Sequence, residues 1–132
     1  NRIMNMQRKN FSSGAPWEDV VGYSRAVLVG NRLEVSGTVA TDESGTVGKG
    51  DFYKQTKFIL QKLEKVLQQA GFELRDVVRT RIFVTDISKW EDVGKAHGEF
   101  FRDIKPATSM VEVSALISPD YLVEIEVTAV RT

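Results

Sequence analysis

The chain of 132 residues contains no cysteine, which excludes disulfides, thiolate metal sites, iron–sulfur clusters and cysteine nucleophiles. It contains one histidine, so a single chain cannot supply a multi-histidine metal site. Its apolar runs are far shorter than the roughly 20 residues that a membrane helix needs. Eighteen basic residues balance eighteen acidic ones, so the net positive charge typical of dedicated nucleic-acid or membrane-surface binders is missing. We therefore expect no metal site, no membrane partner and no nucleic-acid partner.

The composition is that of one globular domain, with 42% hydrophobic and 27% charged residues and no internal repeat. We expect residues 14–132 to form this domain and residues 1–13 to be a flexible N-terminal segment, because it is polar, basic and ends in a Ser-Ser-Gly-Ala-Pro loop. The first ten residues lack the apolar stretch of a secretory signal. A cytoplasmic location is the expectation.

The first half of the chain predicts a hairpin and a long helix. Two β-rich runs flank Gly30-Asn31, which predicts a hairpin over 23–39. Apolar residues then recur at three- and four-residue spacing between an N-cap, Asp51, and a stop signal, Gly71. The polar side of this helix, expected in water, carries Lys54, Gln55, Lys62, Lys65 and Gln69.

The second half predicts three strands and one helix. A strand over 77–87 precedes a helix that we expect to begin at the capping box 88–91 and to end before Pro106. Strands over 108–115 and 122–130 complete the order β-β-α-β-α-β-β. This order predicts an α+β fold, a single mixed sheet with both helices on one face.

Alternation along the strands assigns side chains to two faces of this sheet. The face expected beneath the helices collects Leu33, Val35, Val39, Val78, Ile82, Val84, Val111, Val113, Val123, Ile125 and Val127. The other, polar face collects Glu34, Ser36, Thr38, Arg79, Arg81, Thr108, Met110, Glu112, Glu124, Glu126 and Thr128.

Two interpretations of the polar face stay open. A solvated antiparallel sheet has such a face. Apolar Phe83 and Met110 among pairable arginines and glutamates also suit a subunit interface. A closed ring of subunits meeting there would create clefts between them, where small molecules commonly bind.

Few residues carry obvious chemistry. The glycine-containing loop 45–50 has neither the dinucleotide nor the P-loop spacing. His97 lies inside the second helix, where a lone histidine is most often partly packed. Gly94 and Gly98 beside it each cost ~1 kcal/mol relative to alanine, which indicates a close approach of another backbone or a ligand. The candidate acids, whose pKa values only burial would shift usefully, are Glu112, Glu124 and Glu126.

Several runs in fixed order resemble one known family over about residues 14–131. They are Tyr23-Ser24-Arg25-Ala26-Val27, Val35-Ser36-Gly37, the stretch 78–86, Phe100-Phe101, Pro106-Ala107, Val111-Glu112-Val113 and the stretch 122–126. These runs are similar to the RidA/YjgF family, also called the liver perchloric-acid-soluble protein family. The resemblance implies a chorismate-mutase-like α+β fold and a homotrimer with three clefts between subunits.

The resemblance also implies a chemistry that needs no cofactor. Deaminase members hydrolyse reactive enamines and imines such as 2-aminoacrylate, and an arginine in a Pro-Ala-Arg-Ser/Thr context holds the substrate carboxylate. Here that arginine position is Thr108, and the position often occupied by cysteine is Met110. A helix position that is Asn or Thr in the family falls at Gly94. The matching residues that remain are Tyr23, Ser36, Gly37 and Glu124.

We therefore expect weak or absent activity on 2-aminoacrylate, because a threonine hydroxyl cannot replace a bidentate guanidinium. The expected ligand is a small carbonyl, imine or enamine metabolite, with Glu124 as general acid and base. The residues expected to place it are Tyr23, Ser36, Gly37 and Thr108. Arg25 shares its strand face with Tyr23 and is a substitute guanidinium, or else a surface residue paired with a nearby acid. His97 and Met110 are further candidates for the cleft. An endoribonuclease and a non-catalytic metabolite sensor are the alternatives.

Overall fold

The computed structural model describes residues 7–132 and contains one six-stranded sheet of order β1-β2-β3-β8-β6-β7. Neighbouring strands are antiparallel except β6 and β7, which are parallel, so the predicted mixed sheet is confirmed. The strands are β1 (Arg8–Phe11), β2 (Ala26–Val29), β3 (Arg32–Val39), β6 (Val77–Val84), β7 (Ala107–Glu112) and β8 (Val123–Val130).

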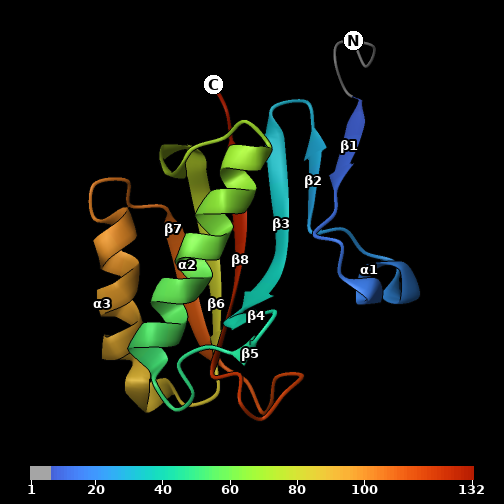
Figure 1. Cartoon of the computed structure of the whole chain (residues 1–132). Helices are drawn as coiled ribbons and strands as arrows, with labels where there is room; N and C mark the ends of the chain where they lie inside the picture. Colours follow the sequence, from blue (N-terminus) through green and yellow to red (C-terminus); the bar gives the residue numbers. More distant parts are fainter. Residues whose placement is uncertain (1–6) are drawn as a thin grey trace.

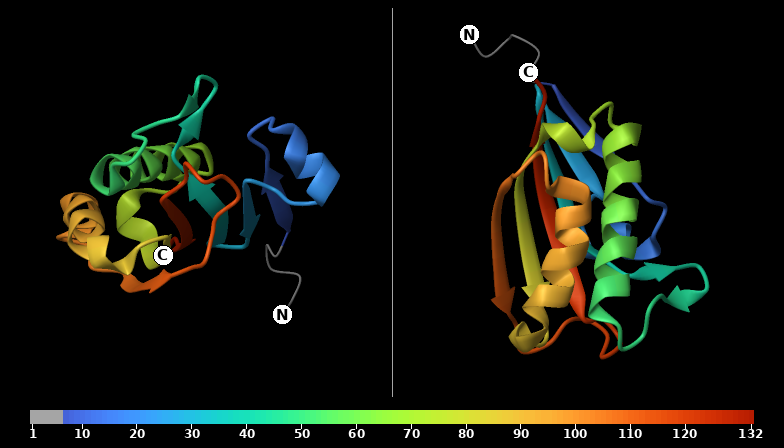
Figure 2. Two further views of the ribbon diagram at one scale, coloured as in Figure 1. Left: turned by 90° about the horizontal axis from the view of Figure 1, so that it is seen from below. Right: turned by 90° about the vertical axis from the view of Figure 1, so that its left-hand side faces the viewer.

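Both long helices cover one face of the sheet, as predicted. Helices α2 (Phe52–Gln69) and α3 (Trp90–Phe101) lie side by side over β3, β8, β6 and β7 (Figures 1 and 2). Strands β1 and β2, at one side of the sheet, extend beyond them together with a short helix, α1 (Pro16–Val21). The largest fully buried apolar side chains between helices and sheet are Leu33, Ile59, Leu60, Leu63, Leu67, Phe72, Ile82, Val84, Val93, Val123 and Ile125.

Local signals explain where α2 begins and ends. The Asp51 side chain accepts a hydrogen bond from the backbone N–H of Lys54 at 2.9 Å, as expected of an N-cap. Gly71 follows the helix with φ +84°, a conformation that L side chains rarely adopt. The start of α3 differs from the prediction, because its N-cap, Lys89, makes no side-chain hydrogen bond and Asp86 instead caps a short 3-10 turn, η2 (Ile87–Lys89).

The predicted assignment of faces is wrong where a strand bulges. The register of β3 on β8 shifts between Val35 and Thr38, so Thr38 is buried and Val39 lies opposite Glu124. A second shift follows Val77, and the side chain of Val78 is 46% exposed. Each bulge inserts one residue and reverses the alternation beyond it.

Strand β7 has the opposite parity to the predicted one. Thr108 lies beside buried Thr80 of β6, and Met110 packs against the core. Val111, expected in the core, is 48% exposed. Alternation could not decide this strand because both of its faces carry an apolar residue. We call the side of the sheet away from α2 and α3 the outer face; it holds Arg79, Arg81, Phe83, Ser109, Val111, Glu124 and Glu126.

The first thirteen residues are more ordered than predicted in the part that the structure describes. Arg8–Phe11 form β1, which pairs with β2, while residues 1–6 lie outside the described residues. Short α1 was not predicted, and its Trp17 is 66% exposed. The remaining elements are a two-stranded hairpin, β4 (Thr41–Asp42) and β5 (Gly45–Thr46), and a 3-10 turn, η1 (Leu74–Asp76).

Two polar residues of α2 that we expected in water are not solvated. Gln55 is fully buried, where it bonds the backbone of Asp120 and Leu122 and so fixes the loop before β8. Lys62 is half-buried, and its Nζ donates to the carbonyls of Val39 and Thr41 at 2.9 and 2.8 Å. No helix within residues 7–132 is both long and apolar enough to cross a bilayer.

Candidate functional site

The bulge in β3 brings Gly37 against the carboxyl group of Glu124 on β8. A Cβ built on Gly37 would lie 2.1 Å from Glu124 Oε2 and 2.8 Å from its Cδ, so only glycine leaves room for this carboxylate. Two residues that the sequence placed in one cleft are therefore in direct contact within one chain. The bulge also explains the glycine, because its backbone needs close approach rather than a left-handed conformation.

Arg25, the residue immediately before β2, also contacts Gly37. We call the group formed by Gly37, Glu124 and Arg25 the corner. The Arg25 guanidinium donates from Nη2 to the carbonyl oxygen of Gly37 at 3.2 Å. Its Nε is the only buried side-chain nitrogen or oxygen among residues 7–132 without a hydrogen-bond partner. A buried N–H of a charged group without an acceptor is costly, and such groups mark places where a ligand or water would bind.

The environment of Glu124 favours its protonated form. Burial raises the pKa of the Glu124 carboxyl above its ordinary value, and the nearby negative charge of Glu126 raises this pKa further. The Arg25 guanidinium acts in the opposite direction but is the smallest of the three influences. A carboxyl with a raised pKa is better able to give and take a proton near neutral pH.

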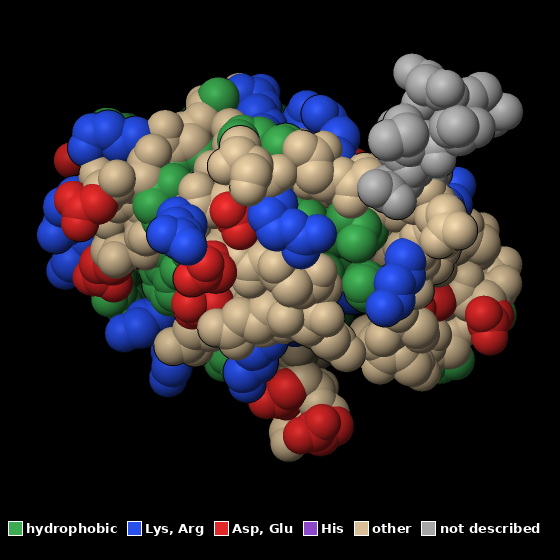
Figure 3. Space-filling model, turned by 90° about the horizontal axis from the view of Figure 1, so that it is seen from above, with side chains coloured by type: hydrophobic (Ala, Val, Ile, Leu, Met, Phe, Trp, Pro, Cys, Tyr) green, Lys and Arg blue, Asp and Glu red, His purple; other side chains and the backbone are tan. Residues whose placement is uncertain are grey.

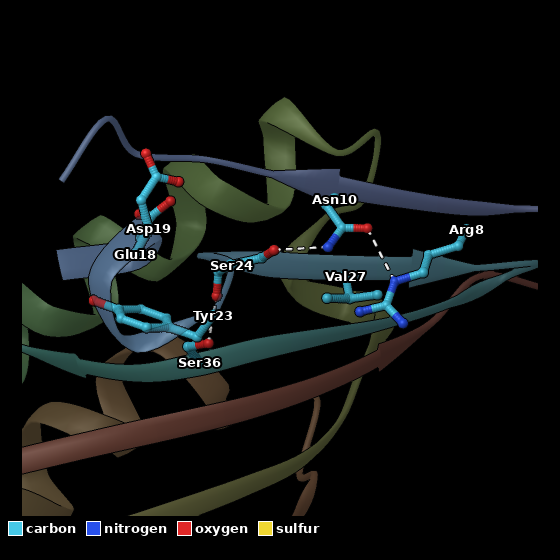
Figure 4. Close-up of a pocket in the computed structure, with 9 residues that line it drawn as sticks. Arg8, Asn10, Glu18, Asp19, Tyr23, Ser24, Val27 and Ser36 are labelled. Carbon is cyan, nitrogen blue, oxygen red and sulfur yellow. Dashed lines mark hydrogen bonds between the residues drawn. The ribbon is translucent and has the colours of Figure 1, made fainter. Parts of the chain in front are cut away.

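Tyr23 and Ser36 lie beside this corner and line a shallow groove of about 500 Å³ (Figure 4). The Tyr23 ring lies 5.9 Å from the Arg25 guanidinium carbon. The hydroxyl of Ser36 donates to the Ser24 carbonyl at 2.6 Å, which ties β3 to the segment before β2. The groove is lined by Arg8, Asn10, Glu18, Asp19, Gly22, Tyr23, Ser24, Val27 and Ser36.

Lys62 is a residue of this region that sequence reasoning missed. Its ammonium group holds the end of β3 through two backbone carbonyls. Burial lowers the pKa of Lys62, and the positive charge of Arg25 lowers it as well. The two cations therefore lie near each other at the bulge. Helical spacing carried no signal for this, because lysine on the polar side of a helix is usually solvated.

His97 and Thr108 are brought together, but in a different place. The buried hydroxyl of Thr80 on β6 lies 3.0 Å from His97 Nε2 on α3 and 2.7 Å from Thr108 Oγ1 on β7. Burial lowers the pKa of the His97 imidazole. The His97 ring also contacts Phe101, with centroids 4.7 Å apart. The sequence singled out His97 and Thr108 but gave no reason to choose Thr80.

Within one chain, the predicted site residues thus form two groups. Tyr23, Arg25, Ser36, Gly37 and Glu124 gather around the bulge in β3. His97 and Thr108 lie at β6 and β7, toward the opposite edge of the sheet (Figure 1). Met110 belongs to neither group, since it packs against the core.

Charges on the outer face form no salt bridge within residues 7–132. Arg81 lies opposite Glu126 in register, and Arg79 donates to the Ser109 hydroxyl at 2.8 Å. The salt bridges among residues 7–132 lie elsewhere, namely Arg32–Glu34, Lys49–Asp120 and Arg75–Glu73. On the molecular face shown in Figure 3, basic and acidic side chains are interspersed. In the described part of the chain no three His, Cys, Asp or Glu residues are grouped to hold a metal ion.

The protein is a small α+β protein with a mixed sheet, two helices on one face of that sheet, and a glycine–glutamate corner at a strand bulge. Comparisons with known proteins identify the family to which it belongs. The model of the endoribonuclease L-PSP family matches residues 14–131. The crystal structure of Rv2704 from Mycobacterium tuberculosis, described as a member of the YjgF/YER057c/UK114 family, is 49% identical, with a TM-score of 0.86 over 95% of this chain and 100% of that chain.

Two sequence relatives agree with this. A RutC family protein of Pyrococcus abyssi is 35% identical over 122 residues, 92% of this chain and 94% of its own length. The 3-aminoacrylate deaminase RutC of Acinetobacter baylyi is 34% identical over 104 residues, 78% of this chain and 82% of its own length. The chain belongs to the RidA/YjgF family.

Proposed function

We propose that this protein is a homotrimer that binds, and slowly hydrolyses, a small carbonyl, imine or enamine metabolite in clefts between its subunits. The corner formed by Gly37, Glu124 and Arg25 carries the proposal, because it combines a proton-exchanging carboxyl with an orphaned guanidinium N–H. A deaminase of 3-aminoacrylate among the relatives supports the ligand class. Charges on the outer face that form no salt bridge within residues 7–132, together with exposed Val111, support the assembly.

Each group at the corner has a distinct task in this proposal. Glu124 gives a proton to the ligand and takes one from the attacking water, which its raised pKa permits. Arg25 donates from Nε to a carboxylate or carbonyl oxygen of the ligand. Tyr23 forms an aromatic wall beside Arg25.

The second group of residues would complete the cleft from the neighbouring subunit. His97 and Thr108 lie on the helix side of the sheet, on α3 and β7, whereas Glu124 lies on the outer face of β8, so in this proposal they line the same cleft through a partner copy. Thr108 offers a single hydroxyl at the position where an arginine guanidinium would bind a carboxylate through two hydrogen bonds. We therefore expect imino acids to be hydrolysed about 100-fold or more slowly than by a site that contains the arginine.

Two measurements test the proposal. Sedimentation velocity should show a trimer, and a panel of small keto acids and carbonyl compounds should raise the melting temperature of the wild type. Arg25→Leu should abolish this stabilisation, whereas the control Arg32→Leu, at an exposed ion pair, should retain it. A monomer in dilute solution, or equal stabilisation of both variants, contradicts the proposal.

An endoribonuclease is the second candidate, favoured by the description of the matching family model. Cleavage beside a 2′-hydroxyl needs paired acid and base groups and a basic track for phosphates. Salt-sensitive RNA binding and cleavage that depends on Glu124 would support it, whereas no binding at low salt would dismiss it. Ligand stabilisation without turnover would instead indicate a metabolite sensor.

A further inference from the structure

Three side chains from three elements form one continuous hydrogen-bonded chain behind Thr108. His97 Nε2 lies 3.0 Å from Thr80 Oγ1, which lies 2.7 Å from Thr108 Oγ1. Thr108 Oγ1 in turn donates to the Pro106 carbonyl at 3.1 Å. Thr80 is fully buried, while Thr108 is exposed, so the chain runs from beneath α3 to the surface.

Counting protons fixes the direction of these bonds. Each threonine hydroxyl has one proton, and the Pro106 carbonyl has none. The Thr108 proton goes to Pro106, so the proton between the two hydroxyls must come from Thr80. Thr80 then has no proton left for His97, so His97 Nε2 must donate to Thr80. Any other arrangement leaves one of the three short contacts without a proton.

The opposite end of the imidazole reaches water. No hydrogen bond is formed by His97 Nδ1 in the described chain, and this atom is not among the buried unsatisfied ones. The His97 ring contacts Thr80 of β6 and Phe101 of its own helix, neither of which carries a charge. Burial lowers the pKa of the imidazole and so favours its neutral form.

We propose that His97, Thr80 and Thr108 form a proton relay that ends at a ligand bound beside Thr108. The ligand carries a proton acceptor there, such as an imine nitrogen or a carbonyl oxygen. Thr108 thus replaces the missing arginine with a group that exchanges protons instead of one that binds a carboxylate. This inference rests on the proposed function, because the ligand is the one assigned to the cleft.

The proton steps balance. When the ligand binds, the Thr108 hydroxyl turns its proton from the Pro106 carbonyl to the ligand while its oxygen still accepts from Thr80. The Thr108 O–H bond then breaks toward the ligand, the Thr80 proton moves to the Thr108 oxygen, and the His97 Nε2 proton moves to the Thr80 oxygen. Nδ1 takes a proton from bulk solvent, which leaves the imidazole neutral as the other tautomer. The reverse transfer, from a water or product at Thr108, restores the start. Thr108 is the catalytic residue in this relay, and Thr80 and His97 position and supply its proton.

The single histidine makes a direct test available. In protein labelled with ¹⁵N-histidine, every imidazole signal comes from His97. At a pH above its pKa we expect Nε2 to carry the proton and that proton to exchange slowly with water. Thr108→Val removes the acceptor of the Thr80 proton, so Thr80 should donate to Nε2 and the imidazole proton should move to Nδ1. Thr108→Ser keeps the hydroxyl and should retain the wild-type spectrum.

A wild-type signal dominated by the Nδ1–H tautomer, or an unchanged tautomer in Thr108→Val, overturns the relay. The tautomer reports the direction of the hydrogen bonds, and the rate of turnover reports whether they carry a proton to the ligand. The second readout is ammonia release from 2-aminoacrylate at high protein concentration. Thr80→Val should reduce it about 10-fold, and Thr80→Ser should stay within twofold of wild type. Equal rates of Thr80→Val and wild type overturn the catalytic role.

The two readouts separate this inference from the proposed function. If the tautomer moves as expected but no protein form releases ammonia, the hydrolytic function fails while the direction of the hydrogen bonds stands. If ammonia is released but the tautomer does not move, the function stands and the relay fails.

Discussion

The carboxyl group of Glu124 occupies the space that any side chain at position 37 would need. Strand β3 presents Gly37 at this point because its register on β8 shifts between Val35 and Thr38. The absence of a side chain at one residue thus sets the position of a proton-exchanging group on another. Arg25, in the segment before β2, donates a hydrogen bond to the Gly37 carbonyl and fixes the corner from there.

Replacing Gly37 with alanine should displace the Glu124 carboxyl while the fold persists. The clash involves the flexible end of a side chain, and Gly37 has no positive φ, so the free energy of unfolding should change by less than about 1 kcal/mol. The ligand affinity measured by thermal stabilisation, or the turnover rate, should fall about 10-fold or more. Gly98→Ala is the control, because no atom lies within 4 Å of its added Cβ. Wild-type ligand binding by Gly37→Ala would contradict the role of this corner.

The raised pKa of Glu124 predicts how stability depends on pH. The folded state holds this proton more tightly than the unfolded chain, so stability should fall as pH rises from the ordinary glutamate pKa of about 4.3 through the raised value. Glu124→Gln should remove this component and be more stable than wild type at neutral pH. Urea unfolding across pH at a fixed protein concentration measures it. Equal pH dependence in both proteins would contradict it.

The neighbours of Glu124 should move its pKa in opposite directions. Glu126→Gln removes a negative charge and should lower the pKa of Glu124, whereas Arg25→Leu removes a positive charge and should raise it. The carboxyl ¹³C shift of Glu124 across pH reports both changes. Shifts of the same sign in the two variants would show that the charges do not act as described.

The lowered pKa of His97 makes the opposite contribution at mildly acid pH. Its stabilising effect should be complete above the unfolded value of about 6.5 and should be lost as pH falls through the lower folded value. His97→Gln should lack this loss. Thermal or urea unfolding at pH 7.5 and below pH 6, compared between the two proteins, measures it. The prediction is wrong if His97 titrates at or above its ordinary pKa.

Restoring the arginine at position 108 should restore the family's chemistry. Thr108→Arg removes the relay hydroxyl but places a guanidinium where a carboxylate would bind, and the gain in carboxylate binding should outweigh the lost hydroxyl, so that kcat/KM for 2-aminoacrylate rises about 10-fold or more. Thr108→Gln, a long side chain without charge, should give no comparable gain. No gain in Thr108→Arg, with the assembly intact, would show that the loss of arginine is not what limits this activity.

The assembly should depend on the outer face of the sheet. Val111→Asp introduces a charge on a half-exposed strand position beside Phe83 and should produce monomers by sedimentation velocity. Gln61→Asp adds the same charge on the exposed side of α2 and should leave the assembly unchanged. Trimeric Val111→Asp would place the subunit contact elsewhere.

The sequence predicted the fold well because its strongest signals are local. The stripe of α2, its cap at Asp51 and its stop at Gly71 all depend on residues close together in the chain. Side-chain alternation failed at Thr38 and Val78, because a bulge reverses the parity of the strand, and in β7, because both of its faces carry an apolar residue. Edge strand β1 was missed because its pairing is set by β2, whose partner residues lie about 15 to 21 positions further along the chain, and because its own residues are mostly polar.

The candidate site was predicted only in part. Resemblance to the family identified Tyr23, Gly37 and Glu124, and strand parity added Arg25. Nothing in the sequence singled out Thr80, because a buried threonine in a strand is ordinary and its importance comes from two partners far away in the chain. Lys62 was missed for the same reason, since its carbonyl partners belong to β3 and the loop after it.

The position of β8 between β3 and β6 has a consequence for biosynthesis. Until β8 leaves the ribosome, the nascent polypeptide has two incomplete half-sheets with nothing to join them. Both halves would expose unpaired strand edges, the surface by which growing chains misassociate. We expect a polypeptide that stops before β8 to aggregate, and chaperone capture to be strongest just before β8 emerges.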